Sequence, residues 1–128
     1  MVDKSAIAKA FCTAYFAAMS SDRGNIGKFY RERSTLTFQG QEFSGAAAIQ
    51  AKLNALGSSD GVPAKIEYKI TKCDVQVSKA PNSLVMLLLG HLRIDGAEPI
   101  GWAQVVHLTT EDAKQWYIYN DIFQLSVE

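Results

Sequence analysis

The chain has few cysteines and no long apolar run. Its two cysteines, Cys12 and Cys73, lie far apart along 128 residues, and each sits within an apolar pattern. The sequence therefore predicts two reduced, buried thiols in a reducing, intracellular compartment. The longest apolar run, residues 84–89, is too short to cross a membrane. The polar start Met1–Ser5 leads us to expect no signal peptide, so no membrane association is expected.

The chain also lacks an excess of charge of either sign. Its 13 basic and 13 acidic residues give a formal net charge of zero. A nucleic-acid-binding domain normally shows a basic excess or a basic stripe, so we expect no direct contact with nucleic acid. The two histidines, His91 and His107, have no paired ligand spacing with the cysteines. We therefore expect neither a metal site nor a cofactor.

What the sequence does contain is the pattern of one domain, residues 1–128, with helices first and strands later. Apolar residues at helical spacing predict three helices, the first capped by Ser5 or Asp3: 5–19, 22–30 and 46–56. A small hairpin is expected at 36–43, with its turn at 39–41. After a loop at 57–61 the apolar period becomes two, which predicts four strands: 66–77, 84–94, 101–109 and 115–125.

The predicted strands are long, and their connections at 80–82, 95–96 and 110–112 are tight turns. They exceed the average strand of roughly 5 to 6 residues, and long neighbouring strands form a strongly twisted, curved sheet. Only the three helices carry apolar stripes that match this sheet, so they must cover its concave face. The predicted fold class is α+β, a cone-shaped curved antiparallel sheet with three helices on its concave face.

Large apolar side chains occur on both faces of the last two strands, because successive side chains alternate across a sheet. The helices cover one face, so the other needs a partner, and a two-fold homodimer through the sheets satisfies it. The candidate interface residues are Trp102, His107, Trp116, Tyr119 and Asp121.

Four local strings carry a resemblance to a known family. They are Asp22–Arg23 with Ile26–Gly27 and Phe29–Tyr30, then Leu36–Gly45 with Ile49 and Lys52–Leu53, then Gly90–Asp95, and finally Tyr117–Leu125. In this order they resemble the nuclear transport factor 2 family, over residues 8–127. The resemblance implies the cystatin-like roll of that family and a homodimeric carrier that binds the GTPase Ran in its GDP form. It also implies binding to phenylalanine-glycine nucleoporins, return of Ran to the nucleus, and a location in cytoplasm and nucleus with enrichment at the nuclear pore.

The resemblance also implies a Ran site, an apolar cavity at the open end of the cone with acidic residues around it. Carried over by position, the cavity wall would comprise Phe38, Leu56, Ile66, Ile94, Ile122 and Phe123, and its rim Gln39, Asp95 and Glu98. The rim departs from the family pattern, since Gln39 stands where a glutamate is usual. Gly96–Ala97 replace a further acidic pair, with Glu98 as the substitute. Lys4 falls near the place of a tryptophan that grips nucleoporin repeats in relatives.

Two alternatives remain open from the sequence. The neutral amide of Gln39 favours the small subunit of the heterodimeric mRNA-export receptor, which pairs with a large subunit, whereas Asn120–Phe123 is closer to the transport factor. The same fold also houses isomerases and dehydratases. The residues to consider for catalysis are Tyr15, Asp95, His107 and Asp121. General acid-base catalysis needs two such groups within hydrogen-bond reach, and the spacing does not show that they converge. We therefore predict no catalytic residue and no enzyme activity.

Overall fold

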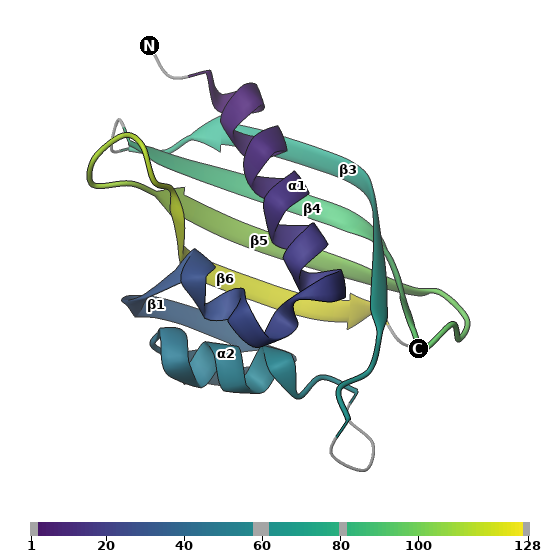
Figure 1. Cartoon of the computed structure of the whole chain (residues 1–128). Helices are drawn as coiled ribbons and strands as arrows, with labels where there is room; N and C mark the ends of the chain where they lie inside the picture. The colour runs from purple at the N-terminus through teal and green to yellow at the C-terminus, as the bar shows by residue number, and fades with distance from the viewer. Residues whose placement is uncertain (1–2, 58–61, 80–81, 127–128) are drawn as a thin grey trace.

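The computed structural model describes residues 3–57, 62–79 and 82–126. Its six strands form one sheet in the order β2-β1-β6-β5-β4-β3. Figure 1 shows β1, β6, β5, β4 and β3 in this sequence across the sheet. The strands are β1 (Tyr30–Phe38), β2 (Gln41–Ser44), β3 (Ile66–Val77), β4 (Ser83–Ile94), β5 (Ile100–Thr109) and β6 (Tyr117–Ser126). Within the described ranges, no helix has both the length and the apolar character needed to cross a membrane. Of the expected connections, residues 58–61 and 80–81 lie outside these ranges.

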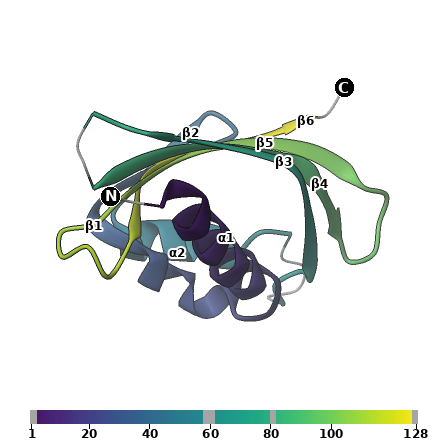
Figure 2. The same ribbon diagram turned by 90° about the horizontal axis from the view of Figure 1, so that it is seen from above.

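Three helices lie in the concavity of the curved sheet, as the view in Figure 2 shows. They are α1 (Lys4–Ser21), the 3-10 helix η1 (Arg23–Phe29) and α2 (Ala46–Asn54). Asp3 is the N-cap of α1, because its carboxylate accepts a hydrogen bond from the backbone N–H of Ala6 at 3.1 Å. The α+β architecture with helices on the concave face is the one that the sequence predicts.

The second helix is shorter and tighter than expected. Sequence spacing places Tyr30 in this helix, but the structure ends the 3-10 turn at Phe29 and makes Tyr30 the first residue of β1. Gly24 and Gly27 weaken an α-helix here. Tyr30 also pairs with Ile118 across the sheet, so β1 starts well before the expected position at Leu36.

The hairpin of β1 and β2 belongs to the main sheet. β1 runs parallel to β6, with Leu36 opposite Asp121 and Phe38 opposite Phe123. The other neighbouring strands pair antiparallel, so the sheet is mixed at this one seam. The parallel pairing carries the aromatic end of β6 beside the aromatic end of β1, and this positions the cavity described below.

The core lies between α1 and the middle of the sheet. Trp102 is only 2% exposed and packs against Phe16, with 5.8 Å between ring centroids. Its ring occupies the space above Gly90, where an added Cβ would lie 2.6 Å from Trp102 Cζ3 and 2.1 Å from the carbonyl oxygen of Lys69. A glycine is therefore required at position 90 for the indole to reach the core.

The two cysteines differ in exposure. Cys12 is buried on the inner side of α1, as predicted, whereas Cys73 is exposed and the prediction for it is wrong. Cys73 lies on β3, which is the edge strand of the sheet. At this edge of the sheet an open groove separates β3 from α1, and Cys73 lines that groove, so α1 leaves its side chain exposed.

Candidate functional site

A small apolar cavity lies between the helices and the sheet where β1 and β6 run side by side. Its lining includes Phe38, Leu53, Leu56 and Phe123, and its volume is about 10 Å³. The rings of Phe38 and Phe123 stack with 4.8 Å between centroids and 4° between planes. A volume this small holds about one water molecule. A partner's side chain can therefore enter only if the aromatic side chains of the wall separate.

Three of the six predicted wall residues line this cavity: Phe38, Leu56 and Phe123. Ile66 and Ile94 lie opposite each other on β3 and β4 and pack against the core. Ile122 does not belong to the wall. It is 48% exposed and lies on the opposite face of β6, because its neighbours Asp121 and Phe123 are the ones that point inward.

The predicted rim residues Gln39 and Asp95 hold the ends of strands. The Gln39 Oε1 atom accepts a hydrogen bond from the backbone N–H of Leu125 at 2.8 Å, so this amide joins β1 to β6. The Asp95 Oδ1 atom accepts from the N–H of Lys65 at 2.9 Å, and the Asp95 N–H donates to the Lys65 carbonyl at 2.8 Å. Both residues have φ near +51°, in the turns after β1 and β4. Glu98 is exposed near the second turn.

A buried polar network forms one wall of the cavity. Asp121 is 1% exposed and accepts hydrogen bonds from the Tyr30 hydroxyl at 2.7 Å and from Gln104 Nε2 at 2.9 Å. The hydroxyls of Tyr15 and Tyr30 are 2.7 Å apart, and Trp102 Nε1 donates to Gln104 Oε1 at 3.1 Å. The chain of contacts thus joins α1, β1, β5 and β6.

Burial dominates the electrostatics of this network. It raises the pKa of Asp121 from 3.8 to about 6, against the opposing effect of the hydrogen bonds from Tyr30 and Gln104. Burial, followed by the nearby Asp121 carboxylate, also raises the pKa of Tyr15 and of Tyr30 well above the usual value. The two tyrosines are therefore neutral hydrogen-bond donors near pH 7, and Asp121 is the group that titrates.

Of the four residues considered for catalysis, Tyr15 and Asp121 are brought together, through the hydroxyl of Tyr30. Asp95 lies at a turn and His107 on the other face of the sheet. Sequence reasoning missed Tyr30 because it placed this residue in a helix. The signal that could have found it is an aromatic residue with a hydroxyl at the boundary between helix and strand.

Arg23 is a second residue whose role only the structure shows. It is 6% exposed and donates to three backbone carbonyls, those of Met19, Leu56 and Ala64, at 3.2, 3.2 and 2.6 Å. Two of these carbonyls lie at the C-terminal ends of α1 and α2, where a cation is favoured. The guanidinium therefore fastens both helices to the start of β3, next to the cavity residue Leu56.

The face of the sheet opposite the helices carries exposed apolar side chains: Val85, Leu87, Val105, Tyr119 and Ile122. We call this side of the sheet the open face. Leu87 and Val105 are cross-strand partners on it, and Val105 in turn lies opposite Ile122, so these three side chains form a continuous row. In Figure 2 the helices of the described ranges all lie on the other side of the sheet.

Two of the five candidate interface residues lie on the open face. The ring of His107 packs edge-on against Tyr119, with 5.7 Å between centroids, and its Nε2 contacts the Ser83 hydroxyl. Trp102 and Asp121 are buried on the helix side, so their assignment to a sheet-to-sheet interface is wrong. Trp116 packs against the core just before β6. Strand alternation puts each of these residues on one face only, and packing under α1 selects the inner face for Trp102 and Asp121.

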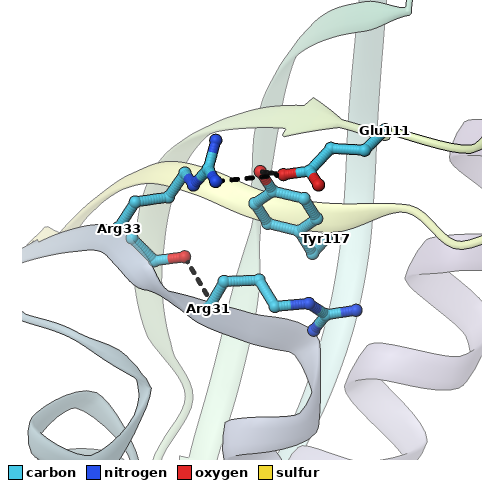
Figure 3. A network of polar contacts seen from close by, with 5 residues as sticks. Arg31, Arg33, Glu111 and Tyr117 are labelled. Atoms are coloured by element: carbon cyan, nitrogen blue, oxygen red, sulfur yellow. Dashed lines mark hydrogen bonds and ion pairs between the residues drawn. The ribbon is translucent and has the colours of Figure 1, made fainter.

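A charged cluster lies where β1 begins and the β5–β6 connection ends. Figure 3 shows that Arg33 and Tyr117 both reach the carboxylate of Glu111, at 3.3 Å each. The guanidinium carbon of Arg31 lies 4.9 Å from the centre of the Tyr117 ring. The Arg33 and Glu111 side chains are 63% and 66% exposed, and exposed ion pairs contribute little to stability. Glu111 thus links Arg33 of β1 to Tyr117 of β6 at the surface.

No group of three or more His, Cys, Asp or Glu side chains in the described part of the chain is arranged to hold a metal ion.

A curved mixed sheet that closes an aromatic cavity against three helices, with its other face open, defines the α+β roll class of proteins. The model of the nuclear transport factor 2 (NTF2) domain matches residues 7–125, so the chain belongs to the nuclear transport factor 2 family. It is 34% identical over 125 residues to nuclear transport factor 2 of Neurospora crassa, covering 97% of this chain and 96% of that protein. It is 36% identical over 126 residues to nuclear transport factor 2 of Kluyveromyces lactis, covering 98% and 96%. The solved structure of nuclear transport factor 2 from Cryptosporidium parvum is similar, with a TM-score of 0.82, 29% identity, and coverage of 92% of this chain and 90% of that one.

Proposed function

We propose that this chain is a nuclear transport carrier that binds Ran in its GDP form and phenylalanine-glycine nucleoporins, and that it acts as a homodimer. Family membership over residues 7–125 supports a role in nuclear transport. The observation that carries the Ran assignment is the cavity, because Phe38, Leu56 and Phe123 line one apolar space. An aromatic side chain of Ran would enter between them after the stacked pair of phenylalanines opens.

Charge at the proposed site comes from Asp95 and Glu98, which are exposed in and after the turn that follows β4. Basic residues of Ran would pair with these carboxylates. Gln39 supplies no charge, and its side-chain oxygen is already hydrogen-bonded to Leu125. Removing a carboxylate that faces a cation in an interface costs about 2 to 5 kcal/mol. We therefore expect a weak complex that depends strongly on Asp95.

A titration of Ran in both nucleotide states tests the proposal. Wild-type protein should bind Ran-GDP more tightly than Ran-GTP, since the carrier reads a conformation of one state. Asp95→Asn keeps the oxygen that accepts from Lys65 and tolerates a positive φ, so it removes only the charge. It should weaken binding, and Asp95→Lys should weaken it further and alter its salt dependence.

Two variants complete this test. Gln39→Glu keeps an acceptor for the Leu125 N–H and adds a carboxylate, so it should strengthen binding to Ran-GDP. Glu32→Lys, a charge reversal near the other end of β1, serves as the matched control and should leave binding unchanged. Equal affinity of wild type, Asp95→Asn and Asp95→Lys would refute the proposed site. Absence of binding to either nucleotide state would refute the Ran assignment.

The homodimer is proposed to form through the open face. Leu87 and Val105 are about 40% exposed in one chain, at 41% and 38%, and exposed apolar patches mark interaction sites. Light scattering should give roughly twice 14.0 kDa at micromolar concentration. Leu87→Lys should raise the dimer dissociation constant at least about tenfold, because it would bury an unpaired ammonium. Val77→Lys, at an exposed valine of β3 outside the open face, is the control; a monomeric wild type would refute the dimer.

Binding to nucleoporins is tested separately with a phenylalanine-glycine repeat peptide. The expected result is saturable binding that is lost when the phenylalanines of the peptide are replaced by serine. Equal retention of both peptides would contradict this part of the proposal.

One observation favours a second candidate function, that of the small subunit of the mRNA-export receptor. The amide of Gln39 is uncharged, and its oxygen serves a structural hydrogen bond to β6. A stable complex with the large export subunit, together with no binding to Ran, would assign the chain to this second function. A homodimer that binds Ran-GDP would exclude it.

A further inference from the structure

A second hollow lies outside the cavity, in the groove between α1 and the edge strand β3. Its volume is about 460 Å³, and its lining includes Lys9, Cys12, Phe16, Ile70 and Cys73. Of these residues, Phe16 alone also lines the cavity proposed for Ran. The groove is apolar apart from its two thiols, one lysine and a few hydroxyls. Two thiols in one apolar groove are its distinctive chemical feature.

Two of the residues that line this groove carry thiols, and the buried Met86 lies beside one of them. In the pairing of β3 with β4, Val75 lies opposite Met86 and Cys73 opposite Leu88. Cys73 and Met86 are therefore diagonal neighbours on the side of the sheet that faces α1. From above, α1 contributes Cys12, whose Sγ lies 4.0 Å from the Sδ of the buried Met86. The thiols of Cys12 and Cys73 line the same groove.

We propose that Cys12, Cys73 and Met86 form a binding site for a soft monovalent metal ion, Cu(I). Thiolate and thioether sulfurs are the ligands that Cu(I) prefers. A metal–thiolate bond of roughly 2.3 Å in a trigonal site places the sulfurs about 4.0 Å apart. This separation matches the 4.0 Å distance from Cys12 Sγ to Met86 Sδ.

Charge and access also suit this ion. Two thiolates and one Cu(I) carry a net charge of −1, and the Lys9 ammonium lines the same groove. Cys12 and Met86 are buried, while the exposed Cys73 gives the ion a path to them. Zn²⁺ prefers four ligands drawn from thiolate, imidazole and carboxylate, and this groove offers only two of them.

Binding should release protons. Burial raises the pKa of Cys12 to about 12, with Cys73 as a further cause, and burial also raises the pKa of Cys73. Both thiols are therefore protonated near pH 7, and each Cu(I) bound displaces two protons, which pass to the buffer. The apparent affinity should rise about 100-fold for each increase of one pH unit in the neutral range, as release of two protons requires.

The experiment is an anaerobic titration of the full chain with Cu(I), in competition with a chromophoric Cu(I) chelator. The wild type should bind one Cu(I) per chain. Cys73→Ser, at an exposed position that leaves the core intact, should abolish this binding, and so should Cys12→Ser. Met86→Leu conserves side-chain volume and should weaken binding roughly tenfold or more, a loss of the size that removal of a supporting residue causes. Met19→Leu, the matched change at a buried methionine of α1 that does not line the groove, should have no effect.

Several outcomes would overturn the inference. Equal Cu(I) affinity in wild type and Met86→Leu would remove the thioether from the site, and retention of binding in Cys12→Ser would remove the thiol pair. Thermal unfolding of the metal-free variants identifies any that fail to fold. If Cys12→Ser is among them, Cys73→Ser and Met86→Leu decide the result.

Discussion

The buried carboxyl of Asp121 makes the stability of this fold depend on pH in an unusual direction. Its pKa is about 6 in the folded chain and 3.8 for an unperturbed carboxyl, so the folded state holds the proton more tightly. Such a group adds its full stability below the unfolded pKa, and this stability is lost as pH rises through the folded pKa. At about 1.4 kcal/mol per pH unit, the loss between pH 4 and pH 6 is about 3 kcal/mol.

Asp121→Asn isolates this contribution. The substituted amide can accept from Gln104 Nε2 and donate to the Tyr30 hydroxyl, which then donates to Tyr15, since either of these hydroxyls can be the donor. The variant has no group that titrates at this position. We therefore expect its free energy of unfolding, relative to wild type, to improve by about 3 kcal/mol from pH 4 to pH 7.

Urea unfolding of both proteins at half-unit pH steps measures this difference. Protein concentration must be equal in every experiment, because self-association would add to the apparent stability. Taking the difference between the two proteins cancels every other titrating group. A difference that is constant between pH 4 and pH 7, or that falls with pH, would refute the assignment of a raised pKa to Asp121.

Three further predictions follow from packing and burial. Gly90→Ala should destabilise the fold by roughly 1 to 3 kcal/mol, because the added Cβ would collide with the Lys69 carbonyl and the Trp102 ring. Urea unfolding measures this loss, and an unchanged midpoint would contradict the packing. Arg23→Ala should lower the free energy of unfolding by roughly 2 to 5 kcal/mol, since three backbone carbonyls lose their hydrogen-bond donor. Chemical denaturation measures this change, and a loss below about 1 kcal/mol would contradict the role of Arg23 in holding the helices to β3. A thiol reagent at pH 8 should label the exposed Cys73 rapidly in native protein and Cys12 only after unfolding, because burial raises the pKa of Cys12 to about 12. Equal labelling rates of the two thiols would contradict this prediction.

The faces of β6 show why part of the candidate site escaped the sequence. Strict alternation from Phe123 would turn Tyr119 inward, yet Tyr119 is 38% exposed. A register shift between β5 and β6 occurs between His107 and Leu108, and it reverses the side on which the following residues lie. A one-residue shift exchanges the two faces of a strand. Ile122 was assigned to the cavity together with Phe123 by position in a family pattern, but successive strand residues point to opposite faces, and Phe123 takes the inner one.

The sequence by itself determined the kinds of element and their order. Helical spacing in residues 5–19 and the alternation from Ile66 onward reflect which positions must meet the core, and this requirement is local in sequence. The tertiary structure decided the contacts across long separations. The parallel seam of β1 and β6, the 2.7 Å contact of Tyr30 with Asp121, and the convergence of Cys12 with Met86 each join residues more than 70 positions apart. Such contacts depend on strand register and on how α1 crosses the sheet. Several residues can be equally suitable partners by sequence pattern, and only the packing of the folded chain decides which of them meet.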